Sequence, residues 1–239
     1  MQDERTPDLE ADLTGRANWS LAGRTLKRTF DIGFVLVALP FCIPAGLIAI
    51  LAIKMDSRGP LIYSTDRVGK NARLFRIYKF RSMSADPGAD GPGLTYSGDP
   101  RVTRVGRWLR RTKFDEFPQI LNVLKGEMSI VGPRPEAPEY VDHYTDKQRT
   151  ALAVRPGLTS LAQVAYRDEE ELIPAEDPVR YYLDEIMPRK LEFDAAYVLG
   201  WSIWMDMKIF LAGIAALFRL PTAFGLDSVA DDDCKPDRA

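Results

Sequence analysis

The feature that most constrains this chain is an uninterrupted apolar stretch. Residues 32–53 read IGFVLVALPFCIPAGLIAILAI, 22 residues without a charged side chain. A stretch of that length can cross the hydrocarbon core of a bilayer as a helix. It begins at residue 32, behind an acidic leader, and it is longer than the apolar core of a secretory signal peptide. We therefore expect a membrane helix and not a cleaved signal.

Two prolines inside this stretch, Pro40 and Pro44, argue against a straight spanning helix. Each removes a backbone hydrogen bond and should kink or break the helix. Basic residues flank both ends of the stretch, and the positive-inside rule places both flanks in the cytoplasm. The flanking residues are Arg24, Lys27, Arg28, Lys54 and Arg58. A helix that breaks at the prolines, enters the membrane and returns satisfies both features, and a kinked spanning helix stays open as the alternative.

The charge of the chain is unevenly distributed, although the net value is only −2. Between Lys54 and Lys113 there are 14 Lys or Arg residues and 5 Asp. A basic middle suits an anionic partner, which is a phosphorylated substrate, a membrane surface or nucleic acid. Nucleic acid is disfavoured because neither an aromatic platform nor a recognised binding motif accompanies the charge.

Cysteine and histidine contribute little to the possible chemistry. Cys42 lies in the apolar stretch and Cys234 near the end of the chain, so a disulfide framework is not expected. His143 is the single histidine, which rules out a His-rich metal site. Asp, Glu, Lys and Arg must therefore carry most of any reaction.

The basic middle begins with a predicted strand pair, LIYS (61–64) and LFRIYKF (74–80), separated by turn residues. Residues 84–100 are rich in Gly, Pro and Asp and predict a loop. At its end, Asp99 and Pro100 predict the start of a helix. Arginines recur along that helix every three residues, at Arg101, Arg104, Arg107 and Arg110. Such an amphipathic basic helix is either a solvated face or, beside the membrane stretch, a surface for lipid headgroups or phosphate.

Two adjacent carboxylates, Asp115 and Glu116, come next, just before Pro118 and the segment QILNVL. Proline is tolerated in the first turn of a helix, and Gly126 predicts where this helix ends. One interpretation is that Asp115 merely caps the helix, where the helix dipole favours a carboxylate. A functional interpretation needs support from the surroundings.

That support comes from SIV (129–131), a predicted strand, and the Gly132-Pro133-Arg134-Pro135 turn that follows it. Two prolines restrict the backbone around Arg134, so its planar guanidinium is pre-set to grip a phosphate with two hydrogen bonds. A carboxylate beside phosphate-binding arginines can act as nucleophile, metal ligand or base. Because a carboxylate repels an anionic substrate, we expect a divalent cation between them. Oxygen ligands favour Mg²⁺, with Mn²⁺ as the second choice.

Taken in order, motifs across residues 24–215 resemble the bacterial sugar transferase family, the monotopic phosphoglycosyl transferases. They are KRTFDIG, the proline-broken apolar stretch, DSRGPLIYSTDRVGK, FRIYKFRSM, DPRVTRVGRWLRRTKFDEFPQILNVLKGEMSIVGPRPE, VRPGLTSLAQV and WMDMKIF. Agreement of many motifs in order is more specific than any one of them. The chain departs from the family pattern at Ile43, where serine often precedes the proline, and at Ser160 and Ala162, where Gly and Trp are frequent.

The resemblance implies transfer of a sugar-1-phosphate from a UDP-sugar to polyprenol (undecaprenyl) phosphate, with release of UMP. It also implies an Asp–Glu dyad with Mg²⁺ and a covalent phosphosugar enzyme. Asp115 would be the nucleophile and a metal ligand, and Glu116 a base or a partner in the metal site. The phosphate- or substrate-binding residues expected with them are Lys79, Arg81, Arg110 and Arg134. The product would be the first membrane-bound intermediate of exopolysaccharide or glycoconjugate assembly, which downstream glycosyltransferases extend.

The expected fold is α+β and mostly helical, with interfacial amphipathic helices and a small cytoplasmic catalytic region that contains short strands. We expect a flexible acidic segment (1–23), a re-entrant membrane helix (24–56), the cytoplasmic and interfacial catalytic domain (57–220) and a flexible tail (221–239). The resemblance places the catalytic region at the cytoplasmic face of the bacterial inner membrane. A homodimer is compatible with the sequence, and a neutral hexose and an N-acetylated amino sugar fit equally well as the transferred sugar.

The last third of the chain carries fewer signals. Residues 169–194 predict a loop followed by one charged surface helix. Residues 195–218 are apolar but interrupted by Asp206 and Lys208, and Trp201 and Trp204 suit the membrane interface. A second spanning helix stays an alternative for this segment.

The competing function is that of a catalytically inactive, membrane-anchored adaptor that binds anions. Its basic helix and arginine turn would look the same as those of an enzyme. Asp115 and Glu116 would have no use in it, so their presence favours the enzyme.

Overall fold

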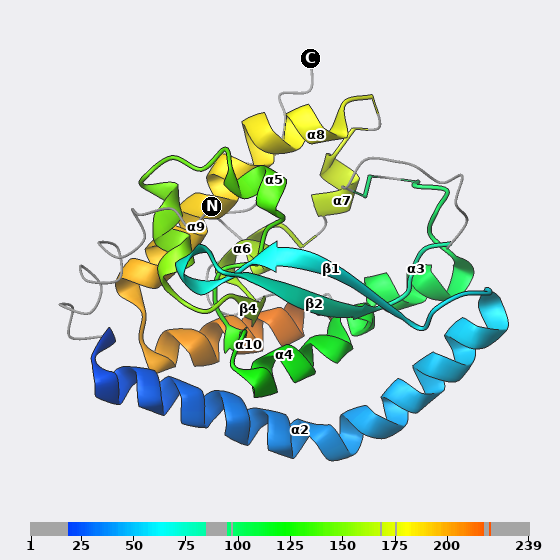
Figure 1. Ribbon diagram of the computed structural model, residues 1–239, viewed down its shortest axis with the longest axis horizontal. Helices are drawn as coiled ribbons and strands as arrows, with labels where there is room; N and C mark the ends of the chain where they lie inside the picture. The colour runs from blue at the N-terminus through cyan, green and yellow to red at the C-terminus, as the bar shows by residue number, and fades with distance from the viewer. Residues whose placement is uncertain are drawn as a thin grey trace.

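The computed structural model describes residues 19–84, 95–96, 98–167, 169–174, 176–217 and 220. Most of the predicted acidic N-terminal segment and of the 84–100 loop, and the tail from residue 221, lie outside the described residues. One long helix curves along the outside of a body built from a β-hairpin, several short helices and two longer helices late in the chain (Figure 1). The mostly helical α+β fold is confirmed.

Helix α2 (Leu21–Asp56) contains the whole apolar stretch. It begins after Ser20, whose side chain accepts a hydrogen bond from the backbone N–H of Gly23. Pro40 and Pro44 lie inside the helix, and the predicted break at these residues is not observed. The helix curves instead (Figure 1). A proline removes one hydrogen bond but leaves those of the neighbouring turns, so a helix can bend without ending.

The outer face of α2 is apolar and largely uncovered. Phe41, Val37 and Ile48 are among its exposed side chains. Within the described residues, α2 is the one helix that is long and apolar enough to cross a membrane by length and composition. An apolar helix face that the described residues leave exposed is compatible with membrane anchoring. The residues that α2 buries against the body are Lys27, Asp31, Val35, Gly46, Ala49 and Ile53.

A buried group of polar side chains, here called the anchoring cluster, attaches the first half of α2 to the body. It consists of Lys27, Tyr197, Trp201 and Asp206. Lys27 donates to Asp206 Oδ2 at 2.6 Å and to the carbonyl oxygen of Val131 at 2.9 Å. Asp206 also accepts from the Tyr197 hydroxyl at 2.7 Å and from Trp201 Nε1 at 3.1 Å. Lys27 is thus not the membrane-flanking surface charge that we predicted, because it neutralises a buried aspartate.

One turn further along α2, Asp31 reaches the short strand β3 (Ser129–Val131). Its Oδ1 accepts hydrogen bonds from the Ser129 hydroxyl at 2.9 Å and from the Ile130 N–H at 3.0 Å. Strand β3 confirms the predicted SIV strand and pairs in parallel with β4 (Gly157–Thr159). Helix α2 is therefore bonded directly to the strand that leads into the arginine turn.

The predicted strand pair is confirmed as an antiparallel hairpin of β1 (Ile62–Val68) and β2 (Leu74–Phe80). A 3₁₀ turn, η2 (Lys70–Ala72), connects the two strands. In Figure 1 the hairpin crosses the middle of the view, with α5 (Pro138–Val141) and α7 (Glu169–Leu172) above it and α4 (Ile120–Lys125) between it and α2. Lys79 pairs with Tyr63 near the open end of the hairpin, the end that faces the carboxylate pair described below.

The predicted basic helix is shorter than expected. Helix α3 (Arg104–Arg111) begins after Thr103, whose hydroxyl accepts from the Gly106 N–H at 2.9 Å. Asp99 was predicted to cap this helix but forms an ion pair with Arg101 at 2.6 Å. Asp99 Oδ1 also accepts from the backbone N–H of Arg101 at 3.0 Å, so this side chain stabilises a turn. Val102 then pairs with Met83 in a β-bridge, and the helix starts only after Thr103.

After α3 come the 3₁₀ helix η3 (Phe114–Gln119) and helix α4 (Ile120–Lys125). Gly126 ends α4 with φ of 85°, as predicted. The following short elements are α5 (Pro138–Val141), η4 (Gln148–Ala153), α6 (Leu161–Ala165) and α7 (Glu169–Leu172). Ser160, one of the departures from the family pattern, caps α6 in a reciprocal arrangement with Gln163.

The charged segment 169–194 folds differently from the prediction. Helix α8 (Pro178–Tyr181) continues through a π-helical turn, η5 (Tyr182–Ile186), into α9 (Met187–Gly200). Lys190 and Asp194 of α9 are buried, so the predicted surface helix is wrong in part. Lys190 contacts carboxylates and a tyrosine hydroxyl, and Asp194 lies near Lys190 and Arg134, as described below.

The apolar segment 195–218 is divided between α9 and α10 (Ile203–Leu217). Helix α10 has 15 residues, about 22 Å of helix against a hydrocarbon core of about 30 Å. The alternative of a second spanning helix therefore does not hold for the described residues. Trp204 is exposed, but Trp201 is buried and stacks on Trp19 with ring centroids 4.5 Å apart. The predicted interfacial position is wrong for Trp201.

Candidate active site

The carboxylate pair lies on the tight turn η3, between two phenylalanines. Phe114 and Phe117 stack on each other with centroids 5.3 Å apart, and both stack on Phe80 of β2. This aromatic packing fixes the turn, and Asp115 and Glu116 are held in it with 6% and 8% of their surfaces exposed.

Helix α2 packs against the same turn. Gly46 of α2 lies against Phe117, and a Cβ atom at this glycine would be 3.1 Å from Phe117 Cε1. The absence of a side chain at position 46 thus lets the turn pack closely on the helix.

The interpretation of Asp115 as a helix cap is wrong. The residue before η3 is Lys113, in the left-handed conformation, and the residue before α4 is Gln119. Neither helix start has a side-chain capping bond. Asp115 therefore has no capping role in either helix.

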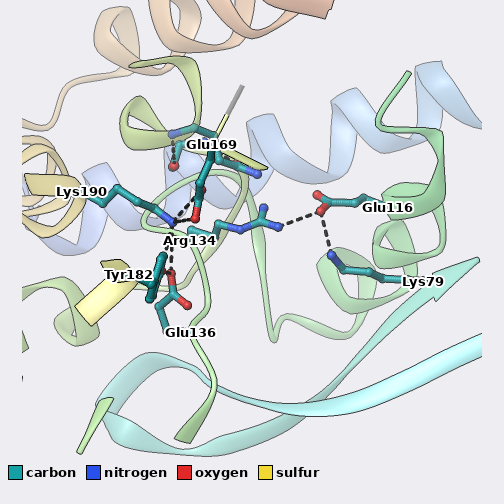
Figure 2. Close-up of polar contacts among 9 residues, drawn as sticks. Lys79, Glu116, Arg134, Glu136, Glu169, Tyr182 and Lys190 are labelled. Carbon is teal, nitrogen blue, oxygen red and sulfur yellow. Dashed lines mark hydrogen bonds and ion pairs between the residues drawn. The ribbon is translucent and has the colours of Figure 1, made fainter. Parts of the chain in front are cut away.

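Glu116 is held by two cations (Figure 2). Lys79 Nζ lies 2.8 Å and Arg134 Nη2 lies 2.9 Å from the same oxygen, Oε1. Burial alone would raise the pKa of Glu116, but Arg134 and Lys79 hold it well below its usual range. Glu116 is consequently an ionised, immobilised carboxylate, and it joins the β-hairpin to the arginine turn.

Asp115 differs from its neighbour. Burial raises the pKa of Asp115 and the charge of Glu116 adds to this, while Lys79, Arg110 and Lys113 act in the opposite direction. Its Oδ1 atom is buried and accepts no hydrogen bond from any described residue. We call this atom the open oxygen. A buried polar atom without a hydrogen-bond partner destabilises the fold, and a bound ligand would supply the missing partner.

The arginine turn is packed closely against β4. The Gly132 N–H donates to the Thr159 carbonyl at 3.0 Å, and the Gly157 N–H donates to the Pro133 carbonyl at 2.8 Å. A Cβ atom at Gly132 would lie 2.6 Å from the Arg155 carbonyl oxygen, so only glycine allows this approach. Arg134 thus comes from a rigid turn, as its flanking prolines predicted.

The structure brings only some of the predicted site residues into contact. Lys79, Glu116 and Arg134 are in direct contact, and Arg110, in the last turn of α3, is near enough to lower the pKa of Asp115. Arg81 instead donates to the carbonyl and hydroxyl oxygens of Ser57, at 2.7 and 2.9 Å. It therefore ties β2 to the end of α2.

Sequence reasoning missed a second layer of charged residues behind Arg134. Figure 2 shows Glu136, Glu169, Tyr182 and Lys190 gathered there. Glu136 is part of the quoted motif GPRPE, and that position was the available signal. The other signal was the spacing of Lys190 with the apolar residues Met187 and Leu191, which indicates a buried helix face.

The residues present fit a divalent cation only in part. Among the described residues, no group of three or more Asp, Glu, His or Cys side chains could hold a metal ion. Mg²⁺, however, commonly binds through one or two carboxylates together with water and substrate phosphates. The open oxygen of Asp115 fits such a cation, with the remaining ligands supplied by a bound diphosphate.

The structure thus combines a long apolar helix, which is compatible with membrane anchoring, with buried carboxylates that are surrounded by cations suited to phosphoryl groups. The sequence profile of the family described as bacterial sugar transferase matches residues 22–220. The chain belongs to this family.

Three relatives support the assignment. The chain is 41% identical to an undecaprenyl-phosphate glucose phosphotransferase of Komagataeibacter xylinus, over 77% of this chain and 34% of that protein. It is 38% identical to a UDP-glucose:undecaprenyl-phosphate glucose-1-phosphate transferase of Caulobacter vibrioides, over 83% and 72%. It is 40% identical to exopolysaccharide production protein PSS of Rhizobium leguminosarum bv. phaseoli, over 80% and 94%. The chain thus spans about a third of the Komagataeibacter protein and most of the Rhizobium protein.

Proposed function

We propose that the chain is a phosphoglycosyl transferase that moves a sugar-1-phosphate from a UDP-sugar to undecaprenyl phosphate. The products would be undecaprenyl-diphosphate sugar and UMP. Family membership and the activities for which the Komagataeibacter and Caulobacter relatives are named support this reaction. The Rhizobium relative supports a place at the start of exopolysaccharide assembly, before downstream glycosyltransferases extend the lipid-linked sugar.

The observation that carries the proposal is the open oxygen of Asp115. It is buried among cations and accepts no hydrogen bond within the described part of the chain. Structural carboxylates in protein interiors are normally bonded. Asp194 Oδ1 also has no partner among the described residues, so the open oxygen distinguishes Asp115 only together with its neighbours Lys79, Arg110 and Lys113. A carboxylate oxygen among these cations suits a nucleophile that attacks phosphorus.

The reaction would proceed in two displacements. In the first, an oxygen of Asp115 attacks the sugar-linked phosphorus, an O–P bond forms, and the bond to the bridging oxygen breaks. The electron pair of that bond leaves with UMP. In the second, a phosphate oxygen of undecaprenyl phosphate attacks the same phosphorus, and the Asp115 carboxylate leaves. The covalent intermediate means that the soluble donor and the lipid acceptor need not bind together.

Lys79, Arg110 and Lys113 lower the pKa of Asp115 against the effect of burial, and an ionised carboxylate or phosphate oxygen attacks without the help of a base. Glu116 suits a different role, since a carboxylate with a lowered pKa and two ion pairs is a poor proton acceptor. We assign it to positioning Lys79 and Arg134, whose charges would offset the charge of the transferring phosphoryl group. Arg110 would act on the same charge from α3.

A divalent cation completes this charge balance. When bound, Mg²⁺, or Mn²⁺ in its place, would neutralise part of the diphosphate charge. Asp115 is the residue that would hold it, and the surrounding lysine and arginine side chains would keep the donor oriented.

The membrane arrangement belongs to the same proposal. Helix α2 has 36 residues, about 54 Å of helix, which is well over the hydrocarbon thickness of about 30 Å. A curved helix of that length fits a bilayer if it enters and leaves on one side. We assign both ends to the cytoplasmic face of the inner membrane, where UDP-sugars and the phosphate of the lipid meet. A homodimer is compatible with this arrangement.

The reaction is tested with purified protein, undecaprenyl phosphate, Mg²⁺ and a panel of UDP-sugars. UMP release with at least one donor is expected, together with a phosphosugar adduct on the peptide that contains Asp115 when the acceptor is omitted. Asp142→Asn, a change at an exposed aspartate, is the matched control for Asp115→Asn. If no donor releases UMP while UDP-sugars still bind, the chain is the anion-binding adaptor instead.

The topology is tested by labelling single cysteines at Ala22 and Met55, exposed residues near the two ends of α2, after replacement of Cys42 and Cys234. Both cysteines are expected to react from the cytoplasmic side in sealed inverted vesicles. Reaction of the two from opposite sides would establish a spanning helix and overturn re-entry.

A further inference from the structure

Arg134 lies between two groups of charged side chains (Figure 2). On one side is Glu116, bound to Lys79. On the other is a group that we call the support network: Glu136, Glu169, Tyr182, Lys190 and Asp194. The reaction proposed above uses the first group and gives no role to the second.

Lys190 is the centre of the support network. Its Nζ lies 3.0 Å from Glu169 Oε2, 3.1 Å from the Tyr182 hydroxyl oxygen and 3.5 Å from Glu136 Oε1. The Tyr182 hydroxyl donates to Glu136 Oε1 at 2.6 Å. Lys190 therefore joins α7, η5 and the residue that lies two positions after Arg134.

Helix α9 holds the arginine turn at two points. The backbone N–H of Arg134 is close enough to the Asp194 carboxylate to lower its pKa, and Lys190 holds Glu136. The two α9 residues are four positions apart and so lie on one face of the helix. Each is only 3% exposed. The Glu136 carbonyl oxygen also accepts from the Val68 N–H at 2.9 Å, which ties the end of the turn to β1.

The charges of the network act on the same turn. Burial alone would lower the pKa of Lys190, but Glu169 and Glu136 raise it, so the ammonium group stays charged. Burial likewise opposes the charge of Arg134, and Glu116, Glu136 and Glu169 together raise its pKa. The guanidinium is thus held by carboxylates of both groups.

We infer that Lys190 and Asp194 are positioning residues that fix the Arg134 turn from behind, so that its guanidinium meets the donor phosphate without rearrangement. The inference rests on the proposed function. A displacement of about 1 Å in a group that contacts a reacting phosphate can lower the rate about 100-fold. A purely structural network would instead stabilise the whole fold and would have no particular connection with Arg134.

A double-mutant cycle separates the two roles. kcat/KM for UMP release is compared for the wild type, Lys190→Met, Arg134→Gln and the double variant. Lys190→Met is expected to lower kcat/KM about 100-fold when Arg134 is present. In the Arg134→Gln background the same change is expected to cost no more than about threefold, because no guanidinium is left to position.

Further variants keep the test valid if Lys190→Met does not fold. Tyr182→Phe removes a single hydroxyl group, and it is expected to lower kcat/KM about tenfold, again only when Arg134 is present. Lys190→Arg retains the charge and should recover most of the activity. Lys147→Met changes an exposed lysine and is the matched control. Thermal unfolding of every variant identifies any general loss of structure.

Equal losses in the two backgrounds would overturn the inference, and so would folded Lys190→Met and Tyr182→Phe variants with normal kcat/KM. The same cycle is measured as the Kd of the UDP-sugar by calorimetry, which does not depend on turnover. Failure of the wild type to release UMP would thus count against the proposed function alone. A non-additive cycle in Kd would still support the positioning role.

Discussion

Asp206 and Asp115 are both buried aspartates with lysine or arginine nearby, yet their surroundings differ. In the anchoring cluster, Asp206 receives hydrogen bonds on both oxygens, from Lys27, Tyr197 and Trp201. In the candidate active site, Asp115 keeps an oxygen that no described residue bonds. Both aspartates are buried near cations, and they differ in whether each carboxylate oxygen has a hydrogen-bond partner.

The difference indicates how each region uses its buried charge. A fully bonded ion pair resists rearrangement and fixes α2 on the body, which is what an anchor requires. An incompletely bonded carboxylate is less stable in the free protein and gains a partner only when a ligand arrives. Changes in the first region should therefore affect stability, and changes in the second should affect activity.

The largest expected effect separates the two regions most clearly. Asp115→Asn should lower UMP release by about 10⁴-fold or more, because an amide cannot form the covalent phosphosugar. The melting temperature should stay unchanged or rise, since the variant removes a buried charge with an open oxygen. Turnover and thermal unfolding are measured on the same preparation. Turnover near the wild-type rate would exclude the covalent route.

The converse effect is expected in the anchoring cluster. Lys27→Met leaves Asp206 buried without its cation and should cost about 3–5 kcal/mol of stability. The protein that remains folded should keep its UMP release. Chemical unfolding in detergent gives the loss, with the exposed Lys208→Met as the matched control. A stable but inactive Lys27→Met protein would break the comparison.

A smaller effect sharpens the contrast between the adjacent carboxylates. Glu116→Gln should lower kcat/KM about 100-fold, because Lys79 and Arg134 lose the carboxylate that places them. The charge of Glu116 also contributes to the raised pKa of Asp115. Its removal should lower that pKa, so the acidic limb of the pH–rate profile should move to lower pH. A limb that moves to higher pH would contradict the assigned roles.

A further test concerns the support network and the pH dependence of stability. Burial raises the pKa of Asp194 to about 8, so the folded protein binds a proton that the unfolded chain has lost above its ordinary pKa. Stability should therefore decrease as the pH rises from about 4 to about 8, by about 1.4 kcal/mol per pH unit for one proton. Asp194→Asn should flatten this slope, as measured by unfolding at several pH values. An unchanged slope would show that Asp194 is not the group responsible.

The fold followed from the sequence wherever the signal was local. The apolar stretch, the strand pair at 61–64 and 74–80, the SIV strand and the glycine that ends α4 all have a nearby physical cause. Helix capping was harder, since Asp99 and Thr103 are both good caps. Asp99 stabilises a turn instead, because Val102 pairs with Met83 in a β-bridge before the helix begins.

The sequence alone predicted those members of the candidate site that lie in one motif. Asp115, Glu116 and Arg134 lie within 20 residues of each other, and the structure brings Glu116 and Arg134 into contact. The roles of Lys190 and Lys27 were missed because their carboxylate partners are far away in the sequence. Lys27 and Asp206 are 179 positions apart, and no local pattern identifies such a pair. For Arg81, the family motif predicted phosphate binding, whereas its contacts in the fold are with Ser57.

The contact between Gly46 and Phe117 has a mechanical consequence. Phe117 rests on the backbone of α2, and it is two residues from Asp115. If α2 lies in the bilayer as proposed, a tilt of this helix in a thinner or thicker bilayer would therefore move the carboxylates with it. The height of the proposed nucleophile above the acyl chains would then be set by a glycine that takes no part in the chemistry.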